Sequence, residues 1–400
     1  MEGRDIKLNN ILETSPQYGF TASATSKKTG VQMLRITDIQ NGSVDWSAVP
    51  FCEISKNKEN KYLLQKYDIV FARTGATTGK TFLITDDLKN KIVFASYLIR
   101  VRPNKSVLPE YLYHFFQSQR YWSQIVTRGG IKPNFNASKL KNIEITLPFD
   151  SDGKPDLAEQ KRIADKLDKV FAEVEKGTNT LSKNAQYANK VGASAMRQLL
   201  TTAKLGEIEL GKVLNLQNGR AFKETDWSTK GLPIVRIQNL NNPEARFNHY
   251  EPKVEERFLI DSGDLLISWS GTPGTSFGAF IWQRGKAILN QHIFNAVPTS
   301  DKFSKGYLKY AVGEKLDEMI LNSHGGVGLQ HITKTDLVKV KLPIPLKDGE
   351  PDLERQESIA DELDKMFSYS KNLSLTIEKQ RQAFSSLRSS VLNQSFQLQT

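Results

Sequence analysis

The residue types that support catalysis in other proteins occur in this chain at spacings that complete no reaction centre. The segment Gly75–Thr81 (GATTGKT) resembles a phosphate-binding loop, but only three residues separate its glycines where that motif needs four. Asp156, Glu159 and Lys161 faintly resemble the carboxylate and lysine cluster of a nuclease, yet they lie too close together to hold a metal ion between two strand ends. We interpret the two segments as a glycine-rich turn and as the acidic start of a helix.

Histidine and cysteine give no catalytic or metal site either. No two of the five histidines have zinc spacing with a third ligand nearby, so we expect lone surface or base-reading residues at His114, His249, His292, His324 and His331. The single cysteine, Cys52, excludes an intramolecular disulfide framework and fits a reducing cytoplasm. The sequence also lacks a nucleophile elbow, an adenine methyltransferase motif and any ATPase motif, so we predict a non-catalytic chain without a bound metal or cofactor.

Polar, basic and aromatic residues gather instead in predicted loops at equivalent places of the two halves of the chain. Arginine pairs with guanine, asparagine and glutamine pair with adenine, and lysine and threonine hold phosphates. These loops therefore predict DNA recognition, although a surface or scaffold role remains the alternative for each residue singly. The candidates are Arg35, Arg73, Thr74, Lys80, Arg128, Lys132, Asn134, Asn136, Arg236, Trp269, Ser270, Lys286, Asn290, Gln291, His292, His324, Gln330 and His331.

The charge of the chain agrees with a polyanionic partner. The 400 residues carry a formal net charge of +11, and residues 1–150 alone carry 21 Lys/Arg against 13 Asp/Glu. A basic protein of this size often meets a nucleic acid, with plain solubility as the other explanation. No apolar run is long enough to cross a membrane, and residues 1–10 lack the apolar core of a secretory signal. The composition predicts a cytoplasmic protein.

A full-length internal duplication organises these residues. Residues 153–171 and 349–367 share the pattern Pro-Asp-Leu-x-x-Gln followed by Ile-Ala-Asp and Leu-Asp-Lys, at an offset of 196 residues. Matching pairs recur upstream in the same order, for example at Asp68 and Asp264 and around Arg35 and Arg236. A repeat of this length predicts two copies of one structural unit.

Each copy reads as a mixed α/β globular segment followed by a long helix. Short apolar runs between turn signals predict strands at 69–72, 81–84, 97–101, 143–147, 265–268 and 280–282. Helical spacing predicts helices over 109–122 and 307–321. Pro155 and Pro351 stand before the long helices, and Asp156 and Asp352 are the predicted N-caps.

The long helices carry apolar residues at alternating steps of four and three, which is a heptad seam. A seam must be covered, and each helix packing on its own globular domain is one way to cover it. Only the sister helix is as long as the seam, so we predict that the two helices form an antiparallel coiled coil. The predicted seam residues are Ile163, Leu167, Val170, Val174, Leu181, Ile359, Leu363, Met366, Leu373, Ile377, Phe384 and Leu387.

The duplication and its motifs resemble the specificity subunit of type I restriction-modification enzymes. The most specific marks are the two Leu-Pro…Pro-Asp-Leu-x-x-Gln…Ile-Ala-Asp-x-Leu-Asp-Lys stretches at 147–169 and 342–365, and the resemblance covers essentially the whole chain. It implies an α/β (α+β) fold with two target-recognition domains at 1–150 and 206–350. Two conserved helices at 151–205 and 351–400 would join them, giving a pseudo-twofold internal repeat.

The resemblance also implies a function and partners. Each domain would read one half of a bipartite, asymmetric site in double-stranded DNA, and the chain itself would do no chemistry. Two modification subunits would supply the S-adenosylmethionine-dependent adenine methylation. Restriction subunits would add translocation and cleavage driven by ATP and Mg²⁺. The alternatives are a stand-alone nucleic-acid- or protein-binding scaffold without a methyltransferase partner, and a nuclease, for which the motifs are missing.

Overall fold

The chain divides into two compact units in the computed structural model. The structure describes residues 3–40, 42–127, 130–131, 135–202, 205–242, 244–271, 276–315, 319–320, 324–326 and 329–397. The first unit combines Met1–Ser182 with Glu378–Thr400, and the second consists of Lys183–Ile377. Each unit thus holds one globular domain together with parts of both long helices.

The globular domain of the first unit is built mainly of short antiparallel strands with four short α-helices. Its strands are β1 (Gly3–Lys7), β2 (Leu12–Tyr18), β3 (Val31–Leu34), β4 (Ile39–Gln40), β5 (Ser43–Val44), β6 (Ile69–Ala72), β7 (Thr81–Leu83), β8 (Lys91–Phe94), β9 (Leu98–Pro103), β10 (Val126–Thr127), β11 (Gly130–Ile131) and β12 (Glu144–Pro148). Its helices are α1 (Lys56–Tyr62), α2 (Pro109–Phe115), α3 (Gln119–Ile125) and α4 (Ala137–Lys141), with 3-10 turns η1 (Leu8–Ile11), η2 (Ile36–Asp38) and η3 (Gly75–Thr77).

The globular domain of the second unit repeats this inventory. Its strands are β13 (Leu205–Glu209), β14 (Leu214–Asn218), β15 (Leu232–Val235), β16 (Asn248–Tyr250), β17 (Leu259–Ile260), β18 (Leu265–Ser268), β19 (Ser270–Gly271), β20 (Gly278–Ile281), β21 (Ala287–Leu289), β22 (Ile293–Pro298), β23 (His324–Gly326), β24 (Leu329–His331), β25 (Lys341–Lys347) and β26 (Glu350–Pro351). Its helices are α6 (Leu210–Val213), α7 (Ile237–Asn241), α8 (Lys305–Glu314) and α10 (Lys334–Leu337), with 3-10 turns η4 (Glu224–Asp226) and η5 (Glu256–Phe258).

The two domains share one topology, so the duplication seen in the sequence is a duplication of the fold. The central sheet has the order β2-β9-β6-β7 in the first domain and β14-β22-β18-β20 in the second. In both, the first strand of the domain pairs with the last long strand, β1 with β12 and β13 with β25. In both, a parallel pair lies beside the central sheet, β3 with β8 and β15 with β21.

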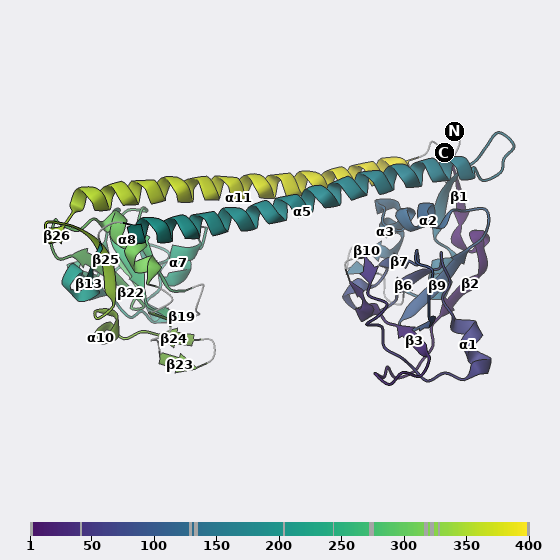
Figure 1. Ribbon diagram of the computed structural model, residues 1–400, viewed down its shortest axis with the longest axis horizontal. Helices are drawn as coiled ribbons and strands as arrows, with labels where there is room; N and C mark the ends of the chain where they lie inside the picture. The colour runs from purple at the N-terminus through teal and green to yellow at the C-terminus, as the bar shows by residue number, and fades with distance from the viewer. Residues whose placement is uncertain are drawn as a thin grey trace. The chain divides into compact units, whose positions relative to one another are not determined.

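Burial explains why these segments form strands. All four residues of β6 and all four of β18 are buried, as expected for short apolar runs at the centre of a sheet. Both strands lie where the sequence predicted them. In the first domain, α2 and α3 lie between the central sheet and the start of the long helix α5 (Figure 1), and side chains from all three elements join one core.

The prediction of one helix over 109–122 is wrong, because the chain breaks it at Ser118. Helix α2 ends at Phe115, and α3 begins at Gln119 with Ser118 as its N-cap, whose hydroxyl oxygen accepts the backbone N–H of Tyr121. The hydroxyl also donates to the carbonyl oxygen of Phe115 at 2.7 Å. Serine favours such caps over helix interiors because its side chain competes for backbone partners. The matching prediction of one helix over 307–321 is interrupted as well, since α8 ends at Glu314 and, of the later residues that are described, Lys315 lies in a turn and 319–320 are helical.

The two long helices are α5 (Leu157–Thr202) and α11 (Leu353–Ser395). Both begin two residues after the predicted proline. The carboxylate of Asp156 accepts the backbone N–H of Glu159 at 2.9 Å, and that of Asp352 accepts the N–H of Arg355 at 3.0 Å. These bonds confirm both predicted N-caps.

The helices pair antiparallel, and the first unit shows this over its own residues. The guanidinium of Arg388 lies 4.4 Å from the centroid of the Phe171 ring, and Arg381 donates to the hydroxyl of Ser182 at 2.8 Å. Later residues of α11 therefore meet earlier residues of α5. Beyond them, Leu392 and Phe396 enter the core of the first domain, where Phe396 is 1% exposed.

The second unit has the complementary arrangement. Leu200, near the end of α5, shares the core of the second domain with Ile359 and Leu363 at the start of α11. Along the intervening turns, Tyr187 and Val191 face the same groove as Met366 and Tyr369. The pairing is antiparallel here as well.

The sister helix covers less of the predicted seam than the sequence suggested. Ile163, Leu167, Ile359 and Leu363 are buried in the cores of the globular domains, so both helices first pack on the domain that precedes them. Val174, Leu181 and Ile377 are buried, and Val170, Met366 and Phe384 are half-buried. Leu373 and Leu387 remain 44% and 47% exposed, so the seam is open at these two positions.

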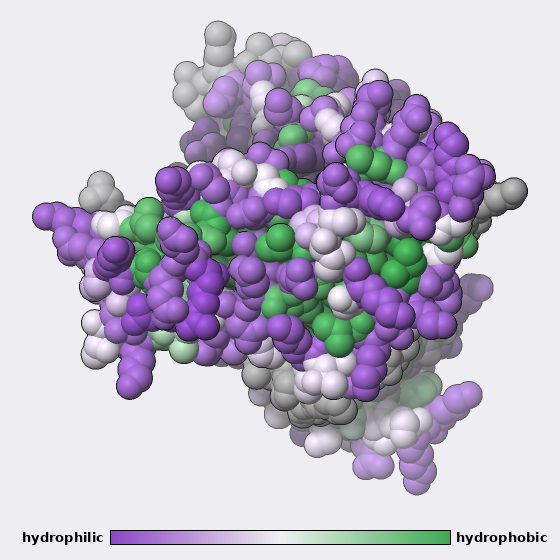
Figure 2. Space-filling view, turned by 90° about the vertical axis from the view of Figure 1, so that its left-hand side faces the viewer, coloured by the Kyte–Doolittle hydropathy of each residue, from purple (hydrophilic) through white to green (hydrophobic). Residues whose placement is uncertain are grey.

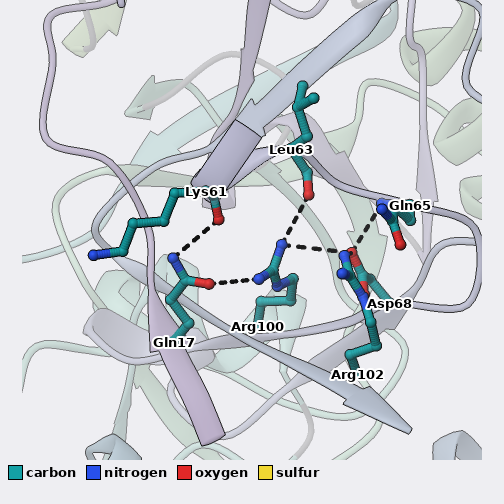
Figure 3. Close-up of polar contacts among 7 residues, drawn as sticks. All are labelled: Gln17, Lys61, Leu63, Gln65, Asp68, Arg100 and Arg102. Carbon is teal, nitrogen blue, oxygen red and sulfur yellow. Dashed lines mark hydrogen bonds and ion pairs between the residues drawn. The ribbon is translucent and has the colours of Figure 1, made fainter. Parts of the chain in front are cut away.

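A buried polar network holds the first domain together (Figure 3). Asp68 is fully buried and accepts two hydrogen bonds from the guanidinium of Arg102, at 2.7 and 2.8 Å. Arg100 is 5% exposed, donates to the carbonyl oxygen of Leu63 at 2.8 Å and to the side chain of Gln17, and lies 3.9 Å from Asp68. The network links β2 and β9 to the segment between α1 and β6, which contains Leu63, Gln65 and Asp68.

Hydrophilic side chains dominate the face drawn in Figure 2, the side that carries β13, β25 and β26, and apolar side chains form patches between them. No helix within the described residues is long and apolar enough to cross a membrane.

Candidate nucleic-acid interface

Equivalent turns of the two domains bring the candidate residues together. In the first domain these are the residues after β3, the turn 95–97 between β8 and β9, and the segment after β2, which meets this turn in a parallel bridge between Phe20 and Ala95. In the second domain, Arg220 and Asn290 form the same bridge. Because one fold positions both sets, a residue of one domain can be compared directly with its counterpart in the other.

In the first domain these segments enclose a pocket of about 520 Å³ with a largely apolar wall, called the first-domain pocket below. Its polar lining consists of Thr21, Arg35, Thr37, Thr74, Thr77, Ser96 and Tyr97, and Tyr97 is 62% exposed. The Arg35 guanidinium is held by Asp38, with Nη2–Oδ1 at 2.7 Å and Nε–Oδ2 at 3.1 Å. The Asp38 carboxylate, which accepts these bonds, raises the pKa of Arg35. The predicted residues Arg35 and Thr74 thus share one pocket.

The second-domain pocket is smaller, about 380 Å³, and more polar. Trp227, the residues after β15 and the turn 290–292 form its walls. The polar residues that line it are Arg236, Gln238, Asn290, Gln291 and His292. The predicted residues Arg236, Gln291 and His292 therefore lie together, as do Arg35 and Thr74 in the other domain.

The surroundings of the His292 imidazole favour its neutral form. Burial lowers its pKa, and the positive charge of Arg236 lowers it further. The side-chain amide nitrogen of Gln291 lies 3.1 Å from Nε2 of His292, so a donating amide leaves the ring proton on Nδ1. That Nδ1 atom is buried with no hydrogen-bond partner among the described residues. A neutral imidazole leaves Arg236 as the only positive charge among the described residues that line this pocket.

Arg73 and Trp269 occupy equivalent positions beside the pockets. The backbone N–H of Arg73 donates to the carbonyl oxygen of Tyr97 at 3.1 Å, and that of Trp269 donates to His292 at 3.3 Å. The Arg73 guanidinium lies 4.8 Å from the centroid of the Tyr18 ring. The Trp269 ring stacks on Phe294, with centroids 5.5 Å apart. Both side chains are packed on an aromatic ring from a strand of the central sheet, Tyr18 of β2 and Phe294 of β22.

Four other predicted residues lie outside the two pockets. Asn136 is the N-cap of α4, where its side-chain oxygen accepts the N–H of Lys139 at 2.9 Å. Ser270 is 9% exposed in β19, paired with His331. Lys286 precedes β21, at the end opposite to the pocket, and Lys80 is an exposed residue of the turn before β7.

Six predicted residues cannot be assigned to either pocket. Arg128, Lys132 and Asn134 lie outside the described residues. His324, Gln330 and His331 belong by their backbone to β23 and β24, but their side chains lie outside the described part of the chain.

The sequence did not single out several residues that line the pockets: Thr37, Ser96, Tyr97, Trp227 and Gln238. Signals for some of them were present. Tyr97 stands 195 residues before His292, close to the repeat offset, and Gln238 follows the matched Arg236-Ile237 pair. Aligning the two copies across the loops would have found these residues, whereas Trp227 has no comparable mark.

Two other interpretations from the sequence can be judged against the structure. Gly75 and Gly79 adopt positive φ of 75° and 85° in a turn that leads into strand β7 rather than a helix, so this is not a phosphate-binding loop. His114 was expected at the surface but is 3% exposed, and its Nε2 lies 2.8 Å from the carboxylate of Asp168. Among the described residues, no group of three or more His, Cys, Asp or Glu is placed to hold a metal ion.

Gly219 keeps the second-domain pocket in shape, because a side chain there would overlap the carbonyl oxygens of Leu289 and Asn290. We expect Gly219→Ala to destabilise the second domain by about 1–3 kcal/mol, as overpacking does. Gly192→Ala in α5 meets nothing within 4 Å and should instead stabilise the chain by about 0.5–1 kcal/mol, because alanine favours a helix. Chemical unfolding of both variants tests this, and the same sign for both would contradict it.

Comparison with known proteins identifies the class of these domains and then the family of the chain. The family model of the type I restriction modification DNA specificity domain matches the chain twice, over residues 4–182 and 204–381. The chain therefore belongs to the family of type I restriction-modification specificity subunits, and the resemblance noted from its sequence is confirmed. It is 23% identical to the type I restriction enzyme StySPI specificity subunit of Salmonella potsdam, over 91% of this chain and 81% of that protein.

Solved structures show the same fold along nearly the whole chain. A chain from a structure of type I R-M complex assembly and conformational transition superposes with a TM-score of 0.75, at 17% identity, covering 99% of this chain and 97% of that one. The HsdS subunit from Thermoanaerobacter tengcongensis gives a TM-score of 0.60 at 18% identity, covering 98% and 96%. The predicted fold class, two α+β domains with two long antiparallel helices in an internal repeat, is confirmed.

Proposed function

We propose that this chain selects the DNA target of a type I restriction-modification complex and does no chemistry itself. Each globular domain reads one half of a bipartite, asymmetric site. The observation that carries the proposal is the contrast between the two pockets. The backbone fold around them is the same, but the side chains at equivalent positions differ. The first domain has Arg35, Thr37 and Tyr97 where the second has Arg236, Gln238 and His292. A duplicated frame with different side chains at one pocket suits the reading of two different sequences.

The long helices are the proposed docking surface for the modification subunits. In the second unit, Tyr187, Val191 and Tyr369 are 64%, 61% and 76% exposed, beside a largely apolar groove of about 680 Å³ between α5 and α11. The first unit has a similar groove of about 890 Å³ between its own parts of the helices. Exposed apolar grooves of this kind mark interaction sites. The modification subunits would hold S-adenosylmethionine, and the restriction subunits would use ATP and Mg²⁺.

A domain exchange tests the proposal. The full chain is expressed with its modification subunits, and the methylated adenines of the host DNA are mapped by long-read sequencing. We expect a split motif, and we expect that replacing residues 6–150 by the same region of a relative changes one half of the motif while the other half stays the same. The half that stays the same is the internal control, because it requires a folded and assembled chain.

Other outcomes would contradict the proposal. If the chain and the modification subunits gave no preference among duplexes with different split sites, it would fail. A chain that binds DNA but is never recovered with a modification subunit would be a stand-alone scaffold. Cleavage of DNA by the purified chain with Mg²⁺ alone would make it a nuclease.

A further inference from the structure

Two arginines occupy the same place in the two domains. Arg35 directly follows β3 and Arg236 directly follows β15, and a short helical turn begins after each. The backbone N–H of each donates to the side chain three residues later, to Asp38 at 2.8 Å and to Asn239 at 3.1 Å. The two turns therefore share this backbone hydrogen bond, and they differ in the side chain that accepts it, which is Asp38 in the first domain and Asn239 in the second.

That difference decides what each guanidinium can do. In the first domain, both carboxylate oxygens of Asp38 accept hydrogen bonds from the Arg35 guanidinium, a two-point ion pair. In the second domain, Asn239 is fully buried and its amide nitrogen donates to the carbonyl oxygens of Ala245 and Arg246, at 3.1 and 3.2 Å. The neutral Asn239 amide thus offers no carboxylate to Arg236.

The Arg236 guanidinium is available for a ligand. Among the residues that the structure describes, it has no hydrogen bond or ion pair. It lies 5.6 Å from the centroid of the Trp227 ring, an arrangement that orients the planar group and leaves its N–H groups free. Arg236 is half-buried and lines the second-domain pocket, and none of the described residues that line this pocket is acidic.

The remaining lining indicates the kind of ligand. Gln238, Asn290, Gln291 and the neutral His292 surround the guanidinium with amide and imidazole groups. Side chains of this type read base edges, and arginine pairs with O6 and N7 of guanine through two parallel hydrogen bonds. Arginine, asparagine and glutamine also bind phosphate oxygens, so the test below separates a base contact from a phosphate contact by its dependence on the base pair.

We propose, building on the proposed function, that Arg236 reads a guanine in the half-site recognised by the second domain. Asn239 at the third position of the turn makes this possible by leaving the guanidinium unpaired. The guanidinium of Arg35 is instead bound by the carboxylate of Asp38. The two domains therefore differ in whether this arginine is free to form hydrogen bonds with a base.

The test uses the full chain with its modification subunits and three variants. Arg236→Gln removes the guanidinium, and Arg236→Lys keeps the charge but not the planar pair of donors. Arg257→Gln is the matched control, because Arg257 is an exposed arginine of the same domain that pairs with Glu255 and lies outside the pocket. The readouts are the methylation motif in host DNA and the Kd for duplexes that carry each of the four base pairs at one position.

We expect the wild-type chain to prefer one G·C pair in the second half-site by about tenfold or more. Both Arg236 variants should reduce this preference to about twofold or less at that position, while the first half-site and the control remain unchanged. The unchanged first half-site also shows that the variant chains fold and assemble.

Three results would overturn the inference while the proposed function stands. They are a second half-site without a G·C pair, unchanged base preferences in both Arg236 variants, and an equal loss of binding to all duplexes, which would make Arg236 a phosphate contact. A wild-type chain without any split motif would instead overturn the proposed function itself.

Discussion

Asp68→Ala is expected to unfold the first domain at a markedly lower temperature, with a loss of about 3–5 kcal/mol of its stability. Asp68 is fully buried and accepts hydrogen bonds from Arg102 and from the backbone N–H of Gln65. Without its carboxylate, the buried guanidinium of Arg100 loses its counter-charge, and the half-buried guanidinium of Arg102 keeps only the charge of Glu13. Burial already lowers the pKa of Arg100, and Asp68 is the neighbour that partly offsets this effect.

The second domain provides the matched control for this prediction. Asp264 stands 196 residues later and accepts the equivalent backbone N–H, but it is 25% exposed, and its partner Lys305, at 3.0 Å, is 37% exposed. A partly solvated ion pair contributes only about 0–1 kcal/mol, so Asp264→Ala should cost much less than Asp68→Ala. Calorimetry with hydrogen exchange on the strands of each domain separates the two effects. Equal losses in both variants would show that burial of the charge is not the cause.

The sequence predicted those parts of the fold that depend on neighbouring residues. The starts of α5 and α11 follow from Pro-Asp-Leu, because proline and aspartate act within one turn of the chain. The end of α2 was missed because Ser118 stops a helix whose apolar spacing continues through Trp122. The spacing alone cannot show whether a serine hydroxyl will bond to water or cap the next helix.

The pockets could be predicted only in part, since they are made by contacts between distant segments. Arg236 and His292 were named from their chemistry, but their approach depends on the parallel pairing of β15 with β21. From the sequence, Arg35 and Arg236 likewise occupy matching positions of the two copies and have the same predicted role. Their difference depends on Asp38 and Asn239, and its meaning appears only when the guanidinium of Arg35 is seen bound to a carboxylate.

The two domains therefore share one backbone fold and differ in the side chains at particular positions. At the junction with the long helix, the first domain pairs His114 with Asp168, and the second pairs Tyr310 and Lys309 with Asp364 at the equivalent place. A contact between helix and domain is thus retained although its residues differ. The strictest repetition lies in the motif at the start of each helix, where even the hydrogen bonds are the same.

Gln160 and Gln356 of that motif carry the last prediction. Both side chains are fully buried and bridge two backbone groups. Gln160 accepts the N–H of Leu108 at 2.8 Å and donates to Ser106 at 3.2 Å. Gln356 accepts the N–H of Ser304 at 3.1 Å and donates to Lys302 at 3.0 Å. Each glutamine therefore ties the first turn of a long helix to the loop that precedes α2 or α8.

Replacing either glutamine by leucine keeps the volume but removes the partner of a part-buried N–H and of a part-buried carbonyl, and each of these groups that stays shielded from water costs about 1–3 kcal/mol. Gln160→Leu should therefore speed hydrogen exchange at the Leu108 amide without affecting that of Ser304, and Gln356→Leu should do the reverse. Gln186→Leu, at an exposed position of α5, is the control and should change stability by about 0.5 kcal/mol or less. If each variant affected both amides equally, the helix starts would not act as separate local ties. Reciprocal effects would show that the duplicated motif anchors each helix to its own domain.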